Sequence, residues 1–281
     1  MSGVSLPSVR SARRRNWFLW GGTSLLALFA VLALFGPALA PYQPDAQDLF
    51  ALLQPPSSAH WLGTDEVGRD IASRIIVGTR STLSIALASV ALAGAAGIAL
   101  GLLAGYFGGV TDRAILALLD VLLTIPSMVL AIAVVAVAGA NAFGLTVAIT
   151  ISFIPSLARL VRARVLEVEG EDYIAAARGI GMSDSRVLLR HVLPNTTSVV
   201  VIELSLMAGQ AVLIAAALGF LGLGVEPPRP EWGAMLGASR QNLEVAPFVA
   251  IGPGLAVSLL VLAFNLTGDG LRDWLDPTAT S

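Results

Sequence analysis

The segment EDYIAAARGIGMSDSRVLLRHVLPN, residues 171–195, is the one long stretch of this chain that is both polar and helix-like, and it lies between two apolar runs. Its first eight residues are mostly good helix formers, and Gly179 and Gly181 then permit a break in the backbone. A second helix, capped by Ser183 or Asp184, follows the break. The pattern predicts a compact helix-turn-helix outside the bilayer, whose first helix presents a nearly bare alanine face that another protein can approach closely.

The composition places the chain in a membrane. Hydrophobic residues make up 56% and charged residues 13% of its 281 residues, whereas charged residues make up about a quarter of an ordinary soluble domain. The absence of cysteine excludes disulfides, thiolate metal sites and cysteine nucleophiles. All 17 basic residues are arginine, so the chain lacks the phosphate-binding lysine of a P-loop. We therefore expect no catalytic, cofactor or metal site in this chain.

Six apolar runs are long enough to cross a bilayer, which takes about 20 residues of α-helix. Interrupted spans are disfavoured because a backbone polar group has no other partner in lipid. We therefore expect an all-α polytopic membrane protein with six transmembrane helices, five of which form a core over residues 82–268. The six runs are Trp17–Ala40, Thr82–Tyr106, Ala114–Ala138, Ala142–Ala158, Val199–Gly224 and Ala246–Gly268.

The arginines predict the direction of the chain. An even number of spans puts both termini on one side, and that side then holds twelve arginines against five on the other. Following the positive-inside rule, we place residues 1–16, 159–197 and 269–281 in the cytoplasm. The inside arginines are Arg10, Arg13, Arg14, Arg15, Arg113, Arg159, Arg162, Arg164, Arg178, Arg186, Arg190 and Arg272. The outside arginines are Arg69, Arg74, Arg80, Arg229 and Arg240.

Two segments are expected on the outer side. One is the loop 225–245, and the other is the segment 41–81, which begins with turn-forming prolines. Near the end of the second segment Val67, Ile71 and Ile75 recur at four-residue steps. This spacing predicts a short amphipathic helix that lies on the membrane surface.

Gly97, Gly101 and Gly105 lie on one face of the second span because they are spaced by four. Small residues at this spacing let two helices approach closely within lipid. We favour a contact inside the chain over a seam with a second subunit.

Asp120 in the third span and Glu203 in the fifth are the only acids inside the apolar runs, each four to six residues from the expected cytoplasmic end of its span. An ionisable group inside a membrane is a candidate for the substrate pathway. At this depth an arginine near the interface is within reach, so we place structural pairing ahead of a role in transport.

The 171–195 segment resembles the EAA loop of the integral membrane subunits of ABC importers. The pattern of that loop is EAA, three residues, Gly, nine residues, Ile, one residue and Leu-Pro. Ala175 replaces the Glu and His191 replaces the Ile. The matching positions are Ala176, Ala177, Gly181, Leu193 and Pro194, and the proline either stops the second helix or starts the next one.

Three other stretches are similar to the dipeptide, oligopeptide and nickel branch of that family, and the resemblance covers nearly the whole chain from about Trp17. These stretches are LGTDEVGRDIASRIIVGTR (62–80), GLLAGYFGGVTDR (101–113) with DVLLTIP (120–126), and LGFLGLGVEPPRPEWGAML (218–236). The resemblance implies a type I ABC importer permease in a bacterial plasma (inner) membrane, similar to the C-type partner of a B and C pair.

The resemblance further implies a division of labour among several chains. A second homologous permease subunit completes the pathway, two ABC ATPase subunits carry ATP and Mg, and an extracytoplasmic solute-binding protein delivers a dipeptide or oligopeptide. Membrane lipid surrounds the assembly, and nothing points to nucleic acid. Residues 171–181 would then be a coupling helix that the ATPases move as they close around ATP, so that the bundle alternates between inward-open and outward-open states.

The residues expected to couple the chain to the ATPases are Glu171, Asp172, Tyr173, Ala176, Ala177, Arg178, Gly181, Arg190 and Pro194. The residues expected, by position, to dock the solute-binding protein are Asp65, Arg69, Asp70, Arg74 and Trp232.

Three alternatives stay open at this point. The cargo of the same importer type could instead be nickel, a sugar or a peptide-like cofactor, although His60 and His191 are expected on opposite sides of the membrane, which disfavours nickel. An ion-coupled secondary transporter is a second alternative, but no inverted repeat is apparent. A membrane scaffold or receptor that transports nothing is the third.

Overall fold

The structure is a computed structural model that describes residues 9–275, with side chains from residue 17 onward. The described part is helical and contains no β-strand, which confirms the expected all-α class. The helices are α1 Val9–Leu39, α2 Ile71–Phe107, α3 Gly109–Leu123, α4 Ser127–Ala138, α5 Ala142–Glu169, α6 Asp172–Gly179, α7 Asp184–Val187, α8 Leu193–Leu218, α9 Trp232–Ser239 and α10 Phe248–Leu275. Two π-helical turns, Leu188–Val192 and Gly219–Leu223, flank α8, and a 3-10 turn, Arg240–Asn242, follows α9.

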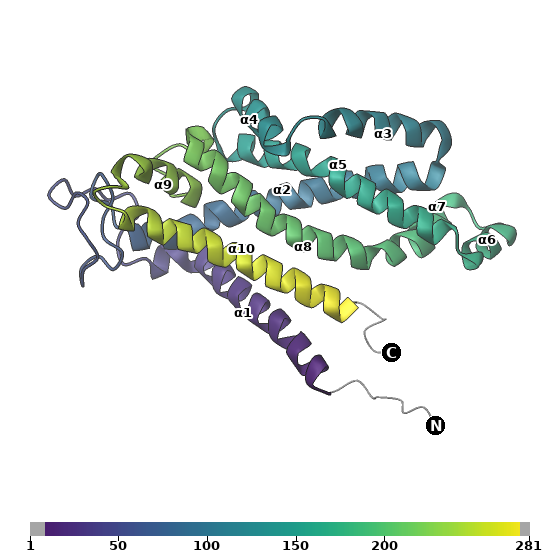
Figure 1. Cartoon of the computed structure of the whole chain (residues 1–281), viewed down its shortest axis with the longest axis horizontal. Helices are drawn as coiled ribbons and strands as arrows, with labels where there is room; N and C mark the ends of the chain where they lie inside the picture. The colour runs from purple at the N-terminus through teal and green to yellow at the C-terminus, as the bar shows by residue number, and fades with distance from the viewer. Residues whose placement is uncertain (1–8, 276–281) are drawn as a thin grey trace.

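The long helices form an elongated bundle (Figure 1). Within the described residues, five helical segments are long and apolar enough to cross a membrane. They are Trp17–Leu39 in α1, then α2, α5, the run Asp184–Leu223 that contains α8, and α10.

The third span is broken, so the prediction of one continuous helix over Ala114–Ala138 is wrong. The axes of α3 and α4 differ by 88°, and the chain turns at residues 124–126 between them. Pro126 explains the break, because proline lacks an N–H and disfavours helical geometry in the residue before it. The two short helices count as a sixth span only if the bent pair is taken together.

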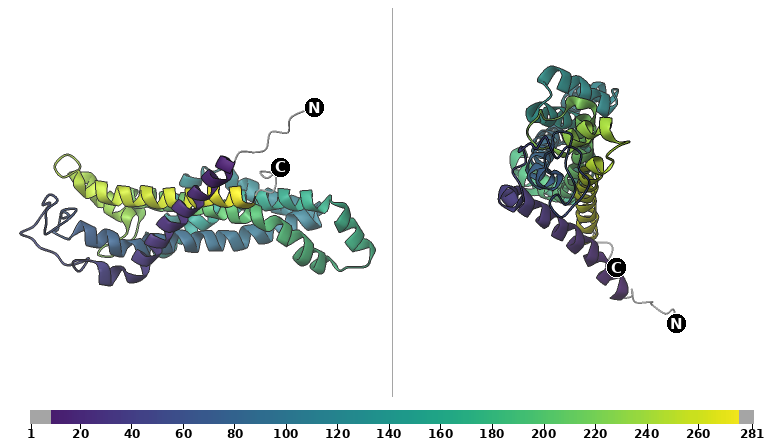
Figure 2. Two further views of the ribbon diagram at one scale, coloured as in Figure 1. Left: turned by 90° about the horizontal axis from the view of Figure 1, so that it is seen from below. Right: turned by 90° about the vertical axis from the view of Figure 1, so that its left-hand side faces the viewer.

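The two ends of the bundle carry different structures. α6 lies beyond the long helices at one end, whereas α9 and residues 40–70 lie at the other (Figures 1 and 2). We call these the α6 end and the α9 end. The first residues of α1 and the last residues of α10 both point towards the α6 end (Figure 1).

α2 packs closely against α5 along the glycine stripe of its sequence. A Cβ atom added to Gly101 would lie 2.6 Å from the carbonyl oxygen of Ala158, and one added to Gly105 would lie 2.7 Å from the Cβ of Val165. Gly97 meets α5 in the same way, one turn further along. The prediction that this stripe serves a contact inside the chain is therefore confirmed.

The separate surface helix predicted within residues 41–81 does not form. α2 begins at Ile71, directly after Asp70, whose carboxylate accepts a hydrogen bond of 2.8 Å from the Ser73 N–H and so caps the helix. The apolar recurrence at Ile71 and Ile75 belongs to the first turns of this 37-residue helix. It reflects packing inside the bundle, where Ile71 is fully buried, rather than contact with a membrane surface.

Candidate functional site

α6 is a short helix at the tip of the α6 end. It turns its apolar residue inward, since Ile174 is fully buried and Ala177 is only 7% exposed. The helical period places Ala177 beside Ile174, which is why this one predicted coupling residue faces the bundle. The other eight are exposed: Glu171, Asp172, Tyr173, Ala176, Arg178, Gly181, Arg190 and Pro194.

The break after α6 depends on backbone geometry. Gly181 has a φ of +83°, in the left-handed region that favours glycine. Nothing lies within 4 Å of a Cβ atom added there, so the requirement is for conformation and not for space. The neighbouring residue, Ile180, is 81% exposed, so an apolar side chain projects from the tip.

A tyrosine that the sequence analysis missed holds this tip against the bundle. Tyr106, in the last turn of α2, is buried, and its hydroxyl donates a hydrogen bond of 2.7 Å to the Asp184 carboxylate at the start of α7. The guanidinium carbon of Arg178 lies 5.1 Å from the centre of the Tyr106 ring, within range for a cation–π interaction. We call Tyr106, Arg178 and Asp184 the Tyr106 clamp.

Arg178 also reaches α5. Its Nη2 donates a hydrogen bond of 2.6 Å to Glu169. Tyr106 first, and Glu169 after it, raise the pKa of Arg178 above its ordinary value, so this side chain stays charged. The tip is therefore tied to both α2 and α5. A lone tyrosine at the end of an apolar span is a signal that could have identified Tyr106, because tyrosine is enriched at membrane interfaces.

The second helix of the predicted helix-turn-helix is not separate. α7 passes through the π turn Leu188–Val192 directly into α8, and the Leu193 N–H bonds back to the Leu188 carbonyl. Pro194 therefore lies inside a continuous helical run, where the wide turn before it accommodates its missing N–H. Ser183 occupies the position before α7 but makes no side-chain capping bond. The carboxylate of Asp184, the other predicted cap, accepts the hydrogen bond from Tyr106 instead.

An open hollow lies beside this run at the α6 end. Leu189, 62% exposed, contributes an apolar side chain to it. The lining residues are Ser183, Ser185, Arg186, Leu189, Arg190 and Pro194. The hollow, the small exposed face of α6 and the apolar Ile180 together make a surface that can receive a protein partner.

Asp120 pairs with an arginine, as predicted. Its carboxylate accepts a hydrogen bond from Arg159 of α5, and the two side chains are 55% and 48% exposed. A second pair, Arg162 with Asp112, joins the same two helices with an Nη2–Oδ2 distance of 2.6 Å. Both pairs fasten α3 to α5.

Glu203 lies well inside a long helical run. That run starts at Asp184, nineteen residues before it, which is roughly 28 Å of helix. The side chain is half-buried and has no hydrogen-bond or ion-pair partner within residues 17–275. The expected structural pairing therefore holds for Asp120 but not for Glu203.

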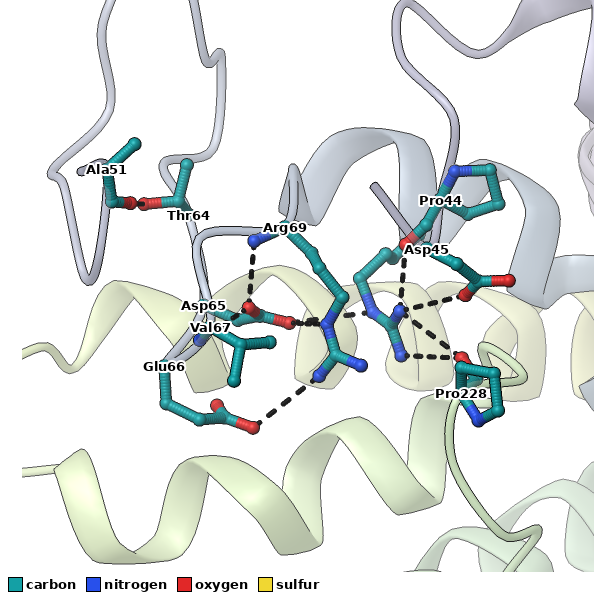
Figure 3. Close-up of polar contacts among 10 residues, drawn as sticks. Pro44, Asp45, Ala51, Thr64, Asp65, Glu66, Val67, Arg69 and Pro228 are labelled. Atoms are coloured by element: carbon teal, nitrogen blue, oxygen red, sulfur yellow. Dashed lines mark hydrogen bonds and ion pairs between the residues drawn. The ribbon is translucent and has the colours of Figure 1, made fainter. Parts of the chain in front are cut away.

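The five docking candidates are buried at the α9 end, at most 7% exposed, and so are unable to contact a docked protein directly. The Asp65 carboxylate accepts 2.7 Å and 2.9 Å bonds from the side chain and backbone of Arg69 (Figure 3). Arg74 donates to the carbonyl oxygens of Pro44, at 2.8 Å, and Pro228, at 3.4 Å. The charged members of this set, predicted from position to face a docked protein, instead join three distant segments of the chain.

Asp70 and Trp232 are likewise engaged internally. Besides capping α2, the Asp70 carboxylate lies 2.9 Å from His60 Nδ1. The Trp232 indole is fully buried and donates a 3.0 Å bond to the Ile75 carbonyl. Before it, the fully buried Glu231 carboxylate accepts bonds of 2.8 Å from two N–H groups of α9, and burial raises its pKa.

Comparisons with known proteins agree with this architecture. A family profile described as "Binding-protein-dependent transport system inner membrane component" matches residues 97–281, and one described as "N-terminal TM domain of oligopeptide transport permease C" matches residues 11–56. "Glutathione transport system permease protein GsiD" of Pectobacterium atrosepticum is 46% identical over 284 residues, which cover 98% of this chain and 94% of the relative. "Dipeptide transport system permease protein DppC" of Alkalihalophilus pseudofirmus is 42% identical over 268 residues, which cover 95% and 88%.

Proposed function

The chain belongs to the family of binding-protein-dependent transport system inner membrane components, and from this premise we propose that it is the peptide-translocating permease subunit of an ATP-driven importer. The family makes it an integral inner-membrane permease of the dipeptide and glutathione transport type. The proposal adds the peptide substrate, the partners and the coupling site.

The proposed orientation puts the α6 end in the cytoplasm together with both termini. The arginine count supports it, because twelve of the 17 arginines belong to the segments assigned to that side. The structure adds that two of the five arginines on the other side, Arg69 and Arg74, are at most 7% exposed and engaged in ion pairs. They contribute little free positive charge there.

The proposed partners are a second homologous permease, two ABC ATPase subunits that bind ATP and Mg, and a solute-binding protein at the α9 end. This chain has no lysine and hence no P-loop, so in the proposed importer ATP is hydrolysed on other chains. The proposed ATPase contact is the exposed surface of α6 together with the hollow beside Leu189.

One observation carries the coupling proposal: α6 is clamped to the bundle, and after the short turn that follows it a long helical run begins at Asp184 and continues to a kink at Gly222. The Tyr106 clamp joins the tip to α2, and the run Asp184–Leu223 extends 40 residues from the tip into the bundle. A movement imposed on α6 would therefore reach the transmembrane helices as a rigid-body displacement rather than being lost in a loop.

A cysteine cross-link tests the ATPase contact. The chain contains no cysteine, so Ala176→Cys introduces a unique thiol on the exposed face of α6. Neighbouring Ala177→Cys is the matched control, because that position is buried. We expect Ala176→Cys to capture an ATPase subunit in native membranes and Ala177→Cys to capture much less. Absence of any captured ATPase, or labelling of α6 from the external face, would overturn the coupling site.

The proposed substrate is a short peptide, glutathione included. The relatives named above are transport-system permeases for glutathione and for dipeptides, and glutathione is itself a tripeptide. Nickel is not favoured, since the described residues contain no group of three or more side chains that could hold a metal ion. Uptake of labelled dialanine and glutathione into vesicles that hold the whole complex and binding protein tests the substrate class. Uptake of neither would overturn it.

The energy source is tested in the same vesicles. We expect uptake to require ATP inside and to survive the collapse of ion gradients. Uptake that persists without ATP but needs a proton or sodium gradient would instead support an ion-coupled transporter.

A further inference from the structure

Two polar side chains, Glu203 and Gln210, lie seven residues apart on α8 and so share one face of it. Leu213, and Phe220 in the π turn after α8, continue that face and are 49% and 39% exposed. Glu203 and Gln210 are two helical turns apart, roughly 10 Å along the axis.

α10 continues this polar face. The two helices pack side by side, and both are in view in Figure 1. Ser258, Asn265 and Asp269 are exposed on α10 at spacings of seven and four residues. The seam is narrow at Gly209, where an added Cβ atom would lie 3.2 Å from Asn265 Oδ1. Asn265 therefore lies level with Gln210, and we call Glu203, Gln210 and Asn265 the seam polar set.

The seam polar set lies within membrane-spanning segments. The residue after Glu203, Leu204, packs against α2 at Gly94, which is thirteen residues from the end of that helix at Phe107, or roughly 20 Å. None of the three side chains has a hydrogen-bond partner within residues 17–275. A carboxylate and two amides are costly against lipid tails, where nothing can hydrogen-bond to them. These three side chains therefore require contact with water or with polar ligands.

From this arrangement we propose that the α8–α10 seam is a wall of the aqueous translocation pathway, and that the Glu203 carboxylate holds a cationic group of the cargo, the terminal ammonium of a peptide. The side-chain amides of Gln210 and Asn265 lie roughly two helical turns closer to the α9 end. They supply hydrogen-bond donors and acceptors for the peptide bonds of the cargo. The identity of the cargo as a peptide rests on the proposed importer function. The existence of an aqueous wall that attracts cations does not depend on that function.

Single cysteines test the wall in membranes that contain the assembled complex and are permeabilised so that both sides are accessible. Gln210→Cys and Asn265→Cys should react with the water-soluble thiosulfonate reagent MTSET. Leu34→Cys on α1 and Leu92→Cys on α2 are matched controls, since their side chains are 73% and 52% exposed on apolar faces. We expect both seam cysteines to react much faster than both controls. If the seam cysteines react no faster than the controls, the seam does not line an aqueous pathway. The same slow reaction would be seen if the second permease covered the seam, and that outcome also overturns the proposal.

Charge selectivity tests Glu203 without any substrate. The ratio of Gln210→Cys labelling by cationic MTSET to labelling by anionic MTSES should fall about fourfold when Glu203→Gln is added, because a carboxylate roughly 10 Å away in water attracts one reagent and repels the other. Glu203→Asp should restore the ratio. An unchanged ratio overturns the cationic site.

Uptake then links the site to cargo. If wild-type vesicles import dialanine, Glu203→Gln should raise its KM about tenfold, the size expected for losing one charged hydrogen bond, with little change in kcat. An equal fall in kcat with no rise in KM contradicts ammonium binding. If wild-type vesicles import neither dialanine nor glutathione, the proposed function fails while the two labelling experiments still decide the seam.

Discussion

Replacing Tyr106 with phenylalanine removes one hydrogen bond from the Tyr106 clamp and keeps the rest of it. The ring that lies under Arg178 stays, and only the 2.7 Å bond from the hydroxyl to Asp184 is lost. A hydrogen bond to a charged group contributes about 1.5–3 kcal/mol, but Asp184 is exposed to solvent, which reduces the loss to about 1 kcal/mol. That corresponds to about a fivefold increase in the fraction of molecules whose tip is detached.

Amide hydrogen exchange on the purified complex measures this detachment. In Tyr106→Phe we expect about fivefold faster exchange over residues 172–187, with α10 unchanged. The number of peptides imported per ATP hydrolysed should fall, because a loosened tip transmits less of the ATPase movement. Tyr42→Phe is the control for loss of a tyrosine hydroxyl, since Tyr42 loses a 2.9 Å bond to the neutral Ala59 carbonyl at the other end of the bundle. Exchange at the tip no faster in Tyr106→Phe than in Tyr42→Phe would refute the clamp.

Three further predictions follow from the glycines and from the buried acid at the α9 end. Gly181→Val should destabilise the turn by about 1–2 kcal/mol, because a β-branched residue is strained at a φ of +83°. We expect normal membrane insertion but poor coupling of uptake to ATP hydrolysis, and a milder effect in Gly181→Asn. Normal ATP-driven uptake in the valine variant would contradict this. Gly101→Ala should destabilise the helix pair by about 1–3 kcal/mol through overpacking, seen as a lower Tm than that of Gly21→Ala, whose added Cβ has nothing within 4 Å; equal Tm values would argue against the close α2–α5 contact. Burial raises the pKa of Glu231, so the stability that its protonation provides is present below its ordinary pKa of 4.5 and is lost as pH rises through the raised value. Gln at position 231 does not titrate, so the Tm of Glu231→Gln should rise relative to that of the wild type as pH rises across that window. A Tm difference between the two proteins that is constant with pH would exclude this explanation.

The features that the sequence predicted correctly are those that depend on local pattern. The apolar runs gave the all-α class and most of the spans, and the four-residue glycine spacing gave the α2–α5 contact. The break after α6 was predicted because two glycines lie within three positions, and Gly181 does adopt a left-handed conformation. Each of these depends on neighbours at most a few turns away.

The features that were missed depend on partners distant in sequence. Asp65, Arg69 and Arg74 look like surface charges within residues 62–80, because nothing there shows that the partner of Arg74 is the carbonyl of Pro228, 154 residues later. Tyr106 looks like the end of an apolar span until Asp184, 78 residues away, is placed beside it. The break at Pro126 is a different case, because its cause is local and visible in the sequence; it was missed because hydropathy alone carries no information on backbone N–H groups.

The π turn before α8 sets the rotational phase of everything that follows it. Each residue of an α-helix advances the side-chain direction by about 100°, so the wide turn at Leu188–Val192 determines which way Glu203 and Gln210 face. Deleting one residue there would leave the tip and the apolar length of the span intact while rotating both polar groups off their face. In the proposed mechanism this turn therefore sets the rotational orientation of the polar face of α8 relative to α6, the proposed ATPase contact.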